Sequence, residues 1–570
     1  MVLLYAQCKV RTPFNDFKED LINFAVIIMH MKKRKINWSV IILALFVTGL
    51  TSCGTERTRE EKVAAMINSI ESPFFVMNSS PGNLIEKSGA ADGALPYTQE
   101  MVLGFFIEEE ITGVDYDLDV QVIVGRGGGF TPNFYGIFKL KDEVVFKELL
   151  ETETGAEIKE KDGYQYVMKE GDSYVIVWNE EFAVATSIPM DISSMFSGGS
   201  KEGMKTVDKT IALIESGDEG EINEMYKTFL ENDADISMRF EGKPFYGYLE
   251  DVSMGMSDEL EEQREMVEEI NSDLFVNFTN GSVDLKWVGN LSERLKEEFG
   301  FLADGPVDKR LLDFGNSKNP MFTMVYNLDL NKGLDYTKEQ MSEYDYEDFE
   351  EELSKMGVNV DLAKAGLTGD ILFVVDRVEM RTEIIDWGYG EPYESNESTP
   401  IFGAVLGIGD IAALSSLVAA SDSLGTDGIL KQGDAYLVIF DDILFSTNDS
   451  LWAVKVKNGG GVTIEDKGDV LTKKPFGMYL DFAKLVGMDD LDGVELAADK
   501  LESLKGEGDI NEMNISLIMN DKTRNALRII TEAVAGFAEG GQGSGEEFEQ
   551  LRNELDEAAA ETAETEVREE

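Results

Sequence analysis

The chain has 570 residues, of which 43% are hydrophobic, and a net charge of −59. Such an acidic chain can bury a large core but disfavours nucleic acid, which attracts basic surfaces. The chain has one histidine, His30, and two cysteines, Cys8 and Cys53. Both His30 and Cys8 precede Cys53. A chain cut before Cys53 has no histidine and one cysteine, which excludes a Ser-His-Asp triad, a Cys-His pair, the usual zinc sites and structural disulfides. We expect no cofactor, although carboxylate enzymes and oxygen-ligand cation sites remain open.

The N-terminal region predicts a lipoprotein export signal. A basic cluster at 32–35 precedes an apolar run from about Trp38 to Leu50, which is too short to span a bilayer comfortably. The order Leu-Thr-Ser-Cys at 50–53 resembles the lipobox of bacterial lipoproteins. In that family the cysteine is acylated and becomes the new N-terminus, which implies a lipid anchor at Cys53. The alternative is a plain signal peptide with an incidental cysteine.

The start of the chain has two interpretations. Met31 directly precedes the basic cluster, so we interpret 1–30 as a mis-assigned start and 31–52 as the signal peptide; the alternative is a genuine extended n-region. Subtracting the seven Lys/Arg and three Asp/Glu of 1–52 leaves 44 basic and 107 acidic residues, a net charge near −63. The polar residues after the cysteine predict a tether over 53–72.

A strand pattern recurs in the body of the chain. Four segments place a proline before an apolar run, where its missing N–H and fixed φ are tolerated. These segments begin at Ser72, Lys243, Asn319 and Lys474. Each is followed by helix-like or loop sequence and then by a second apolar strand. These second strands begin at Asp119, Ser272, Gly369 and Asn514.

A second recurrence supports the first. The segment 135–142, YGIFKLKD, matches 403–410, GAVLGIGD, and both alternate with the period of a strand. Each leads into a helical stretch, beginning at Val144 in the first case and at Ile411 in the second. Each then reaches an apolar hairpin, and we expect the two turns at 179–180 and 441–442.

Because several elements recur in the same order, we predict an α+β fold of two related halves, 73–310 and 320–537. Each half is expected to be mainly antiparallel sheet with helices packed on one face. Chance similarity of strand-rich sequence is the alternative. The acidic residues 538–570 begin with a glycine-rich stretch and predict a flexible tail, either a solvated helix or a disordered segment. No segment after the signal has 18 uncharged apolar residues, so we expect nothing else to span a membrane.

The Leu-Thr-Ser-Cys signal, the DGYQYV segment at 162–167 and the closing NISLIMNDKTRNALRII at 514–530 together resemble one family. It comprises outer-membrane lipoproteins of Bacteroides-type bacteria that are grouped only as a domain of unknown function. The resemblance would cover nearly all of the exported chain. It implies a closing strand followed by a helix near 525–527, and an outer-membrane location facing the periplasm or the cell surface. It supplies no catalytic residue. Gly54 is not the aspartate associated with inner-membrane retention, which also favours the outer membrane.

Several polar segments are candidate sites. Arg126 lies in GRGGGF at 125–130, where it is a weak candidate for contacting an anion, although a connecting loop explains the glycines better. The carboxylates of DYDLDV at 115–120 would share one face of a strand and suit calcium; a solvated strand face is the alternative. The acidic, aromatic 343–353 could bind sugars or cations, and 258–269 fits an exposed acidic helix. We interpret the segment MDDLDG, which contains Asp489, Asp490 and Asp492, as a turn. We therefore predict no metal site and assign no catalytic or ligand-binding residue.

The predicted function is that of an exported, lipid-anchored envelope protein. We expect a binding or structural module without catalysis, with the membrane as one partner through Cys53 and an envelope protein as a candidate second partner. One alternative is a carbohydrate hydrolase with two carboxylates about 5 to 9.5 Å apart across a pocket. The other is an assembly factor or chaperone with a broad apolar groove. A binding module predicts an exposed apolar or aromatic patch.

Overall fold

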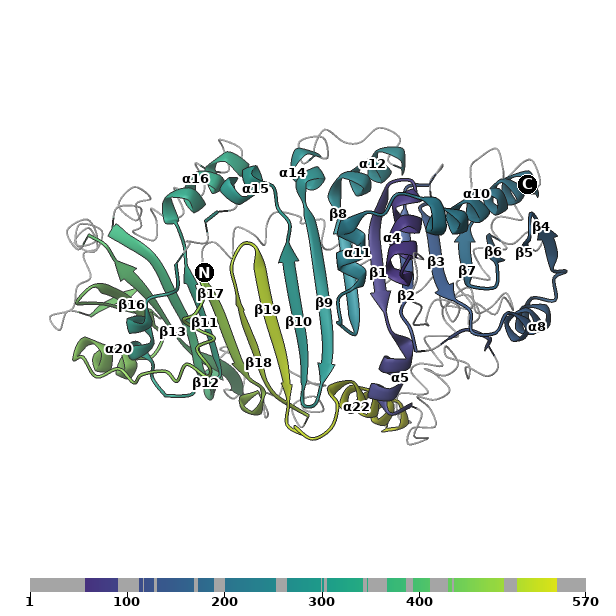
Figure 1. Ribbon diagram of the computed structural model, residues 1–570. Coiled ribbons are helices and arrows are strands. Elements are labelled where there is room, and N and C mark those ends of the chain that lie inside the picture. Colours follow the sequence, from purple (N-terminus) through teal and green to yellow (C-terminus); the bar gives the residue numbers. More distant parts are fainter. Residues whose placement is uncertain are drawn as a thin grey trace, which may run out of the picture. The chain divides into compact units, whose positions relative to one another are not determined.

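The fold is α+β, with antiparallel strands and packed helices, in a computed structural model of the chain (Figure 1). The structure describes residues 57–90, 112–115, 117–127, 131–168, 173–188, 200–252, 264–298, 300–301, 305–341, 346, 366–385, 393–410, 429–432, 435–485 and 500–540. These residues form two compact units. Unit 1 takes those up to Glu86, from Ala90 to Asp233 and from Pro244 to 252, and unit 2 takes the rest. The predicted halves, which were defined by recurring sequence and not by contacts, divide the chain at a different place.

The strands of unit 1 are paired in the order β1-β2-β3-β7-β6-β5-β4, and every pair is antiparallel. They are β1 (Pro73–Ser79), β2 (Val120–Gly125), β3 (Asn133–Lys139), β4 (Lys159–Lys161), β5 (Tyr164–Val167), β6 (Tyr174–Trp178) and β7 (Phe182–Ser187). The helices wholly within this unit are α4 (Arg59–Ser69), α8 (Glu143–Thr154), α10 (Ser200–Glu219) and α11 (Glu224–Leu230). Two further helices, α5 (Pro81–Ser88) and α12 (Gly242–Val252), lie at the sequence boundaries between the units.

Helices cover both faces of the unit 1 strands. On one face, Phe146 of α8 packs edge-on against Phe138 and Trp178 in a buried cluster. On the other face, Val175 and Val177 are also fully buried, and α10 packs against β6 and β7. Side chains alternate between the two faces of a strand, and β6 is apolar on both faces, so both need cover. The prediction of helices on a single face is therefore wrong for this unit.

The segment predicted as a tether is instead part of the folded body from Thr58 onward. The Thr58 side chain accepts a hydrogen bond from the Glu61 backbone, and the Glu61 carboxylate accepts one from the Thr58 backbone, which makes a capping box. The helix α4 that follows buries Val63 to Ile67. Apolar side chains here pack into unit 1, although the preceding residues are polar.

The strands of unit 2 are paired in the order β8-β9-β10-β19-β18-β17-β11-β12-β13-β16-β15-β14, again all antiparallel. They are β8 (Ile236–Glu241), β9 (Asn271–Thr279), β10 (Ser282–Gly289), β11 (Phe322–Asn327), β12 (Leu367–Ile385), β13 (Tyr393–Ile408), β14 (Leu430–Gln432), β15 (Ala435–Phe440), β16 (Ile443–Thr447), β17 (Phe476–Asp481), β18 (Leu501–Gly508) and β19 (Glu512–Met519). Its helices are α14 (Arg264–Glu269), α15 (Glu293–Glu298), η4 (Lys309–Phe314), α16 (Leu330–Gln340), α20 (Ser450–Lys457), η5 (Phe482–Lys484) and α22 (Ala526–Gly540).

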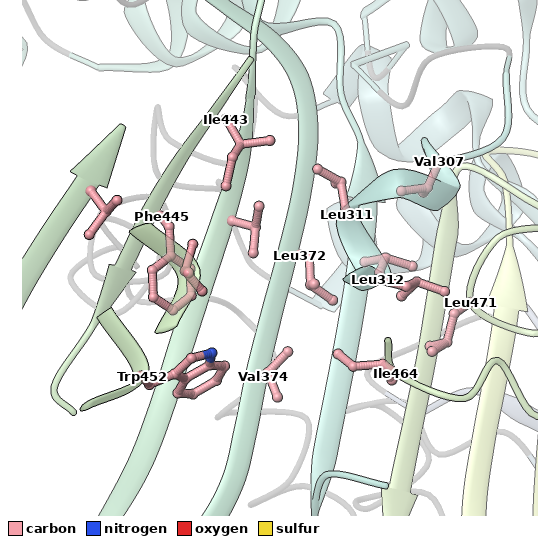
Figure 2. Packing of buried hydrophobic residues seen from close by; sticks show 14 of the residues in the cluster. Val307, Leu311, Leu312, Leu372, Val374, Ile443, Phe445, Trp452, Ile464 and Leu471 are labelled. Carbon is pink, nitrogen blue, oxygen red and sulfur yellow. The ribbon is translucent and has the colours of Figure 1, made fainter. Parts of the chain in front are cut away.

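A large core of unit 2 lies under η4 and α20 (Figure 2). Leu311 of η4 and Trp452 of α20 pack there against Val374 of β12 and Phe445 of β16. The indole lies so close to the sheet that a Cβ on Gly403 would meet it at 2.5 Å. A buried Trp N–H needs an acceptor, and Trp452 Nε1 donates to the Phe314 carbonyl at 3.0 Å.

Three of the four proline-led strands are confirmed as β1, β11 and β17. The fourth, beginning at Lys243, is wrong, because it lies in α12. Pro244 occupies the first turn of that helix, where a missing N–H costs nothing, and the strand is the preceding β8. The second strands are confirmed as β2, β9, β12 and β19, and the two hairpins as β6–β7 and β15–β16. Asp441, in the second turn, has a φ of 51°.

Candidate functional site

Several of the candidate site residues lie outside the described part of the chain. These are Cys53, the whole of 489–492, and 343–353 apart from Tyr346, which is buried. The segment 258–269 is described from Arg264 onward, where it forms α14. Among the helices that the structure describes, none is both long and apolar enough to cross a bilayer.

Arg126, the candidate for contacting an anion, has a carboxylate partner within unit 1. Its guanidinium donates to both carboxylate oxygens of Asp251, at 2.5 and 2.7 Å. This hydrogen bonding raises the pKa of Arg126 and lowers that of Asp251. A bidentate pair of this kind satisfies the cation, so an anionic ligand would have to displace Asp251.

The carboxylates proposed for calcium do not share a strand face, because β2 begins only at Val120. Asp119 is largely buried and accepts a hydrogen bond from Asn78 Nδ2 at 3.0 Å, and Gln121 in turn donates to Asn78 at 2.8 Å. Burial raises the pKa of Asp119 and also that of Asp115. Within the described ranges, no group of three or more Asp, Glu, His or Cys side chains is placed to hold a metal ion.

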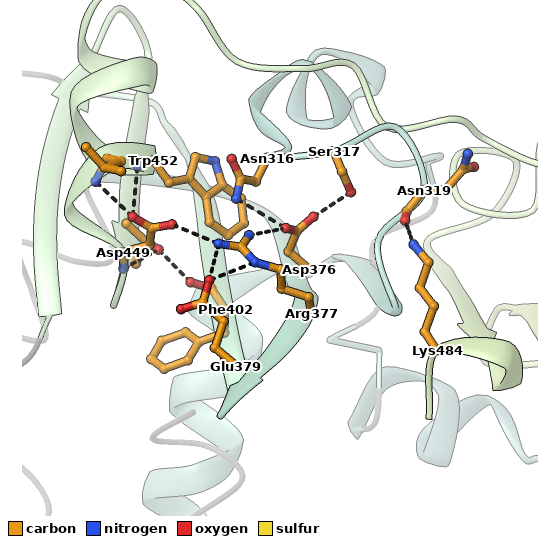
Figure 3. A network of polar contacts seen from close by, with 12 residues as sticks. Asn316, Ser317, Asn319, Asp376, Arg377, Glu379, Phe402, Asp449, Trp452 and Lys484 are labelled. Atoms are coloured by element: carbon orange, nitrogen blue, oxygen red, sulfur yellow. Dashed lines mark hydrogen bonds and ion pairs between the residues drawn. The ribbon is translucent and has the colours of Figure 1, made fainter. Parts of the chain in front are cut away.

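A polar network of unit 2 surrounds Arg377 on β12 (Figure 3). Its guanidinium donates to Asp376 at 2.7 Å and to Glu379 at 2.9 Å, and lies 3.6 Å from the carboxylate of Asp449. Asp376, only 5% exposed, also accepts from Ser317 Oγ at 2.5 Å and from Asn316 Nδ2 at 3.2 Å.

This network has a structural explanation for each of its members. Asp449 caps α20 by accepting from the backbone of Leu451 and Trp452. Asp376 holds the loop that follows η4 against β12. The three carboxylates surround one guanidinium. Both oxygens of Asp376 accept hydrogen bonds, so Asp376 offers neither a general acid nor a free base to a substrate.

A different surface of unit 2 has no such explanation. In an antiparallel sheet, residues that lie opposite each other point to the same side. Trp287 of β10 lies opposite Leu274 of β9 on one side and opposite Met513 of β19 on the other. Leu285 of β10 lies opposite Ile515 of β19. The same side continues across β18, β17 and β11, because Leu517 lies opposite Leu504, Leu504 opposite Leu480, and Leu480 opposite Phe322.

We call this surface the central apolar face. It is formed by Leu274 and Val276 on β9, Leu285 and Trp287 on β10, Met513 and Ile515 on β19, Leu504 on β18, Met478 and Leu480 on β17, and Phe322 and Met324 on β11. All of these side chains remain partly exposed. Six adjacent strands at a spacing of about 4.8 Å make the face about 24 Å wide, and its area is on the order of 300 Å². The largest apolar patch on a typical soluble monomer has a similar area and is often functional.

Glycines let the largest side chains of the face lie flat on the sheet. A Cβ on Gly289 would meet the Trp287 ring at 2.5 Å, and a Cβ on Gly506 would meet Met478 at 2.8 Å. At one end of β9 and β10, Ala526 and Ile529 of α22 form a buried cluster with Val283 and Met519. Val276 and Leu285 of the face pack against this cluster. The helices α14, α15 and α16 lie at the opposite ends of the strands (Figure 1).

On the other side, β9, β10 and β19 carry polar pairs, whereas Val325 of β11 and Tyr479 of β17 belong to the core under η4 and α20. Arg239 of β8 donates to Asp273 of β9 at 2.8 Å, and Ser516 of β19 donates to Asp284 of β10 at 2.6 Å. An antiparallel sheet of this kind faces water on one side and requires apolar cover on the other. The central apolar face is therefore the candidate functional site. Sequence reasoning missed it, although the alternation in NSDLFVNFT at 271–279 was a usable signal.

A comparison with protein-family models, with curated proteins and with solved structures found no match for this chain.

Proposed function

We propose that this chain is an exported, lipid-anchored envelope protein that acts as a binding module, and that the central apolar face is its binding surface. One observation carries the proposal: six adjacent strands present mainly apolar side chains on a side that stays partly exposed. Exposed apolar surface costs about 25 cal/mol per Å² relative to buried surface, so a face on the order of 300 Å² gains several kcal/mol when an occupant covers it.

The location rests on the N-terminal signal. The basic cluster, the short apolar run and the cysteine behind it favour acylation at Cys53 and a membrane as partner. Gly54 and the resemblance to Bacteroides-type lipoproteins favour the outer membrane. The strongly acidic body fits a protein that stays solvated beside the membrane and does not bind nucleic acid.

We also propose that the two predicted halves are an internal duplication. The pairing order β1, β2, β3, β7, β6 of the first half is repeated by β11, β12, β13, β16, β15 of the second. The register agrees where the sequences match. Five consecutive pairs begin with Tyr135 opposite Thr186, and five with Gly403 opposite Thr447. Agreement in both strand order and register favours duplication over chance similarity.

The hydrolase alternative has less support. The central apolar face carries no carboxylate, and the buried Asp376 is fully engaged by its hydrogen-bond donors. An assembly factor that holds client proteins would use the same apolar face, so it differs from our proposal in the ligand and not in the surface.

The test is binding of Nile red, an apolar fluorophore, to the full chain. Ile515→Lys places a charge in the middle of the face and should weaken saturable binding at least tenfold. Asn514→Lys is the matched control, because it adds the same charge one residue away on the polar side, beside Glu512. Circular dichroism and urea unfolding verify that both variants fold. Equal binding by the two variants would mean that the face is not the binding surface.

A further inference from the structure

We propose that one edge of β12 pairs with the same edge of a second copy of this chain, antiparallel and with Met380 opposite Met380. The inference concerns a different surface from the central apolar face and goes beyond the proposed function. It follows from a two-stranded ribbon that continues past the neighbouring strands, from the edge that this ribbon presents, and from the order of charges along that edge.

The β12–β13 hairpin is longer than the strands beside it. β11 pairs with β12 only as far as Val375, and β16 pairs with β13 only from Gly403 onward. Beyond these points residues 377–385 of β12 and 393–401 of β13 pair with each other, and no other strand that the structure describes pairs with either segment. At about 3.4 Å per residue this ribbon is on the order of 25 Å long. A two-stranded ribbon is marginally stable by itself, so a third strand would stabilise it.

A bulge at Asp376 holds the base of the ribbon. The register shifts between Val375 and Arg377, so Asp376 has no residue opposite it on β13. Its buried carboxylate accepts hydrogen bonds from Ser317 and Asn316, which ties the bulge to the loop after η4 (Figure 3). A bulge bends a strand and increases its twist, so this one separates the direction of the ribbon from that of the sheet.

The two edges of the ribbon differ. On the β13 edge, Pro400 has no N–H to donate, and its carbonyl accepts from Asn448 Nδ2 at 2.8 Å. The same Asn448 accepts from the backbone N–H of Phe402 at 3.1 Å. Proline and covering groups are the usual means of blocking an edge. The β12 edge over 377–385 contains no proline, lysine or further bulge, so it is the edge that suits the addition of a strand.

The charges on the β12 edge alternate in sign. Every second position carries a charge, and these positions share one side of the strand. They are Arg377, Glu379, Arg381 and Glu383. In an antiparallel pair of copies with Met380 opposite Met380, Arg377 of one copy lies opposite Glu383 of the other. In the same register Glu379 lies opposite Arg381.

These charges also select the register. Opposite charges that face each other across two strands stabilise a sheet, and like charges destabilise it. A shift of two residues in either direction would place arginine opposite arginine and glutamate opposite glutamate. The register about Met380 is therefore the one in which the four charged positions of each copy all meet the opposite charge.

The described side chains at this edge are open to a second copy. Arg377 donates to Glu379 at 2.9 Å, yet the two side chains remain 43% and 40% exposed, so each has room for a further partner. Met380, at the alternate position of the strand, is 52% exposed. In the proposed pair the two Met380 side chains lie side by side and cover each other from water.

The net charge of the chain favours this edge as the place of contact. With 110 acidic and 51 basic residues, two copies repel each other overall. Along 377–383 the two signs are equal in number, so contact here does not add to that repulsion. Because both copies offer the same pattern, a twofold axis closes the contact, and the pairing stops at a dimer. A strand from another protein would need this alternation as well, whereas a second copy supplies it.

The experiment measures self-association of the full chain by sedimentation equilibrium. We expect a reversible dimer for the wild type. Glu379→Arg and Arg381→Glu each place like charges opposite each other, so each variant alone should dimerise at least tenfold more weakly. An equal mixture of the two should recover the wild-type affinity, because positions 379 and 381 are then both positive in one copy and both negative in the other. Circular dichroism verifies that each variant folds.

Each other outcome overturns the inference. A wild-type chain that stays monomeric would do so, and it would leave the proposed function, which Nile red tests, standing. A dimer that is lost in Ile515→Lys but kept in both charge variants would place self-association on the central apolar face. A mixture of two folded charge variants that associates no better than either alone would mean that the charges do not set the contact.

A disulfide tests the register even where a charge variant does not fold. Met380→Cys, in a chain that also carries Cys8→Ala and Cys53→Ala, should form a linked dimer on mild oxidation, because opposite residues of an antiparallel pair are about 5 Å apart. Val378→Cys in the same background is the matched control. Its two copies would be displaced by four residues, roughly 14 Å, which is too far for a disulfide. Equal linking by both variants, or none by Met380→Cys, would overturn the register.

Discussion

Two leucines of unit 2 allow the central apolar face to be tested by stability alone. Leu372 on β12 is 0% exposed and belongs to the core under η4 and α20, whereas Leu504 on β18 is partly exposed on the central apolar face. Both lie in paired strands of the same unit. Replacing each by alanine removes the same atoms, so the two variants differ only in what surrounds the side chain.

The expected costs differ several-fold. In a packed core, Leu→Ala loses the transfer free energy of the side chain and leaves a cavity, so Leu372→Ala should lower the free energy of unfolding by about 3–5 kcal/mol. A partly exposed leucine loses only part of the transfer term, and water fills the space. For Leu504→Ala we therefore expect a loss of about 1 kcal/mol.

Urea unfolding followed by circular dichroism measures both values in the full chain. The comparison uses the shift in the midpoint of the unit 2 transition, and it requires that the slope of the transition stays unchanged. A loss for Leu504→Ala as large as that for Leu372→Ala would show that a packed layer already covers the face. In that case the central apolar face is core and the binding proposal is wrong.

Four further outcomes are expected. Asp376→Ala should lower the unfolding free energy of unit 2 by about 3 kcal/mol in urea, because it leaves buried donors without an acceptor. Asp142→Ala removes the N-cap of α8 and should cost unit 1 about 1 kcal/mol in the same assay. Burial raises the pKa of Asp119, so at a pH just above the ordinary pKa of an aspartate the folded state binds more protons than the unfolded state. The free energy of unfolding should therefore fall as the pH rises through that window. The fall should be smaller in Asp119→Asn. Cys53→Ala should move the chain from the membrane fraction to the soluble fraction on centrifugation.

Sequence patterns predicted most strands, but they did not distinguish a strand that begins with proline from a helix that begins with proline. A proline before an apolar run indicated a strand correctly at β1, β11 and β17, where the flanking residues are β-branched or aromatic. At Pro244 the same pattern starts a helix, because proline is equally tolerated in the first turn of a helix and in the first residues of a strand. The local sequence does not separate these two cases. In the structure Tyr246 of this helix is fully buried.

Sequence reasoning about the site concentrated on charged segments. Asp119 and Arg126 turned out to have partners close by in unit 1, which no pattern of spacing reveals. The central apolar face is visible in the sequence only as alternation within single strands. Its extent depends on which strands are neighbours, and β10 and β19, which meet in the middle of the face, are more than 200 residues apart in the chain.

The pairing of β10 with β19 explains why the face is continuous. Leu285 lies opposite Ile515, and on either side of this pair Val283 meets Leu517 and Trp287 meets Met513, so apolar residues oppose apolar residues throughout. A slip of one residue would place Asp284 or Ser516 among them, because side chains alternate between the two sides with a period of two. Each proposed half brings its own hairpin to this face, β9–β10 or β18–β19. Joined in this register, the apolar strips of the two hairpins become one continuous surface.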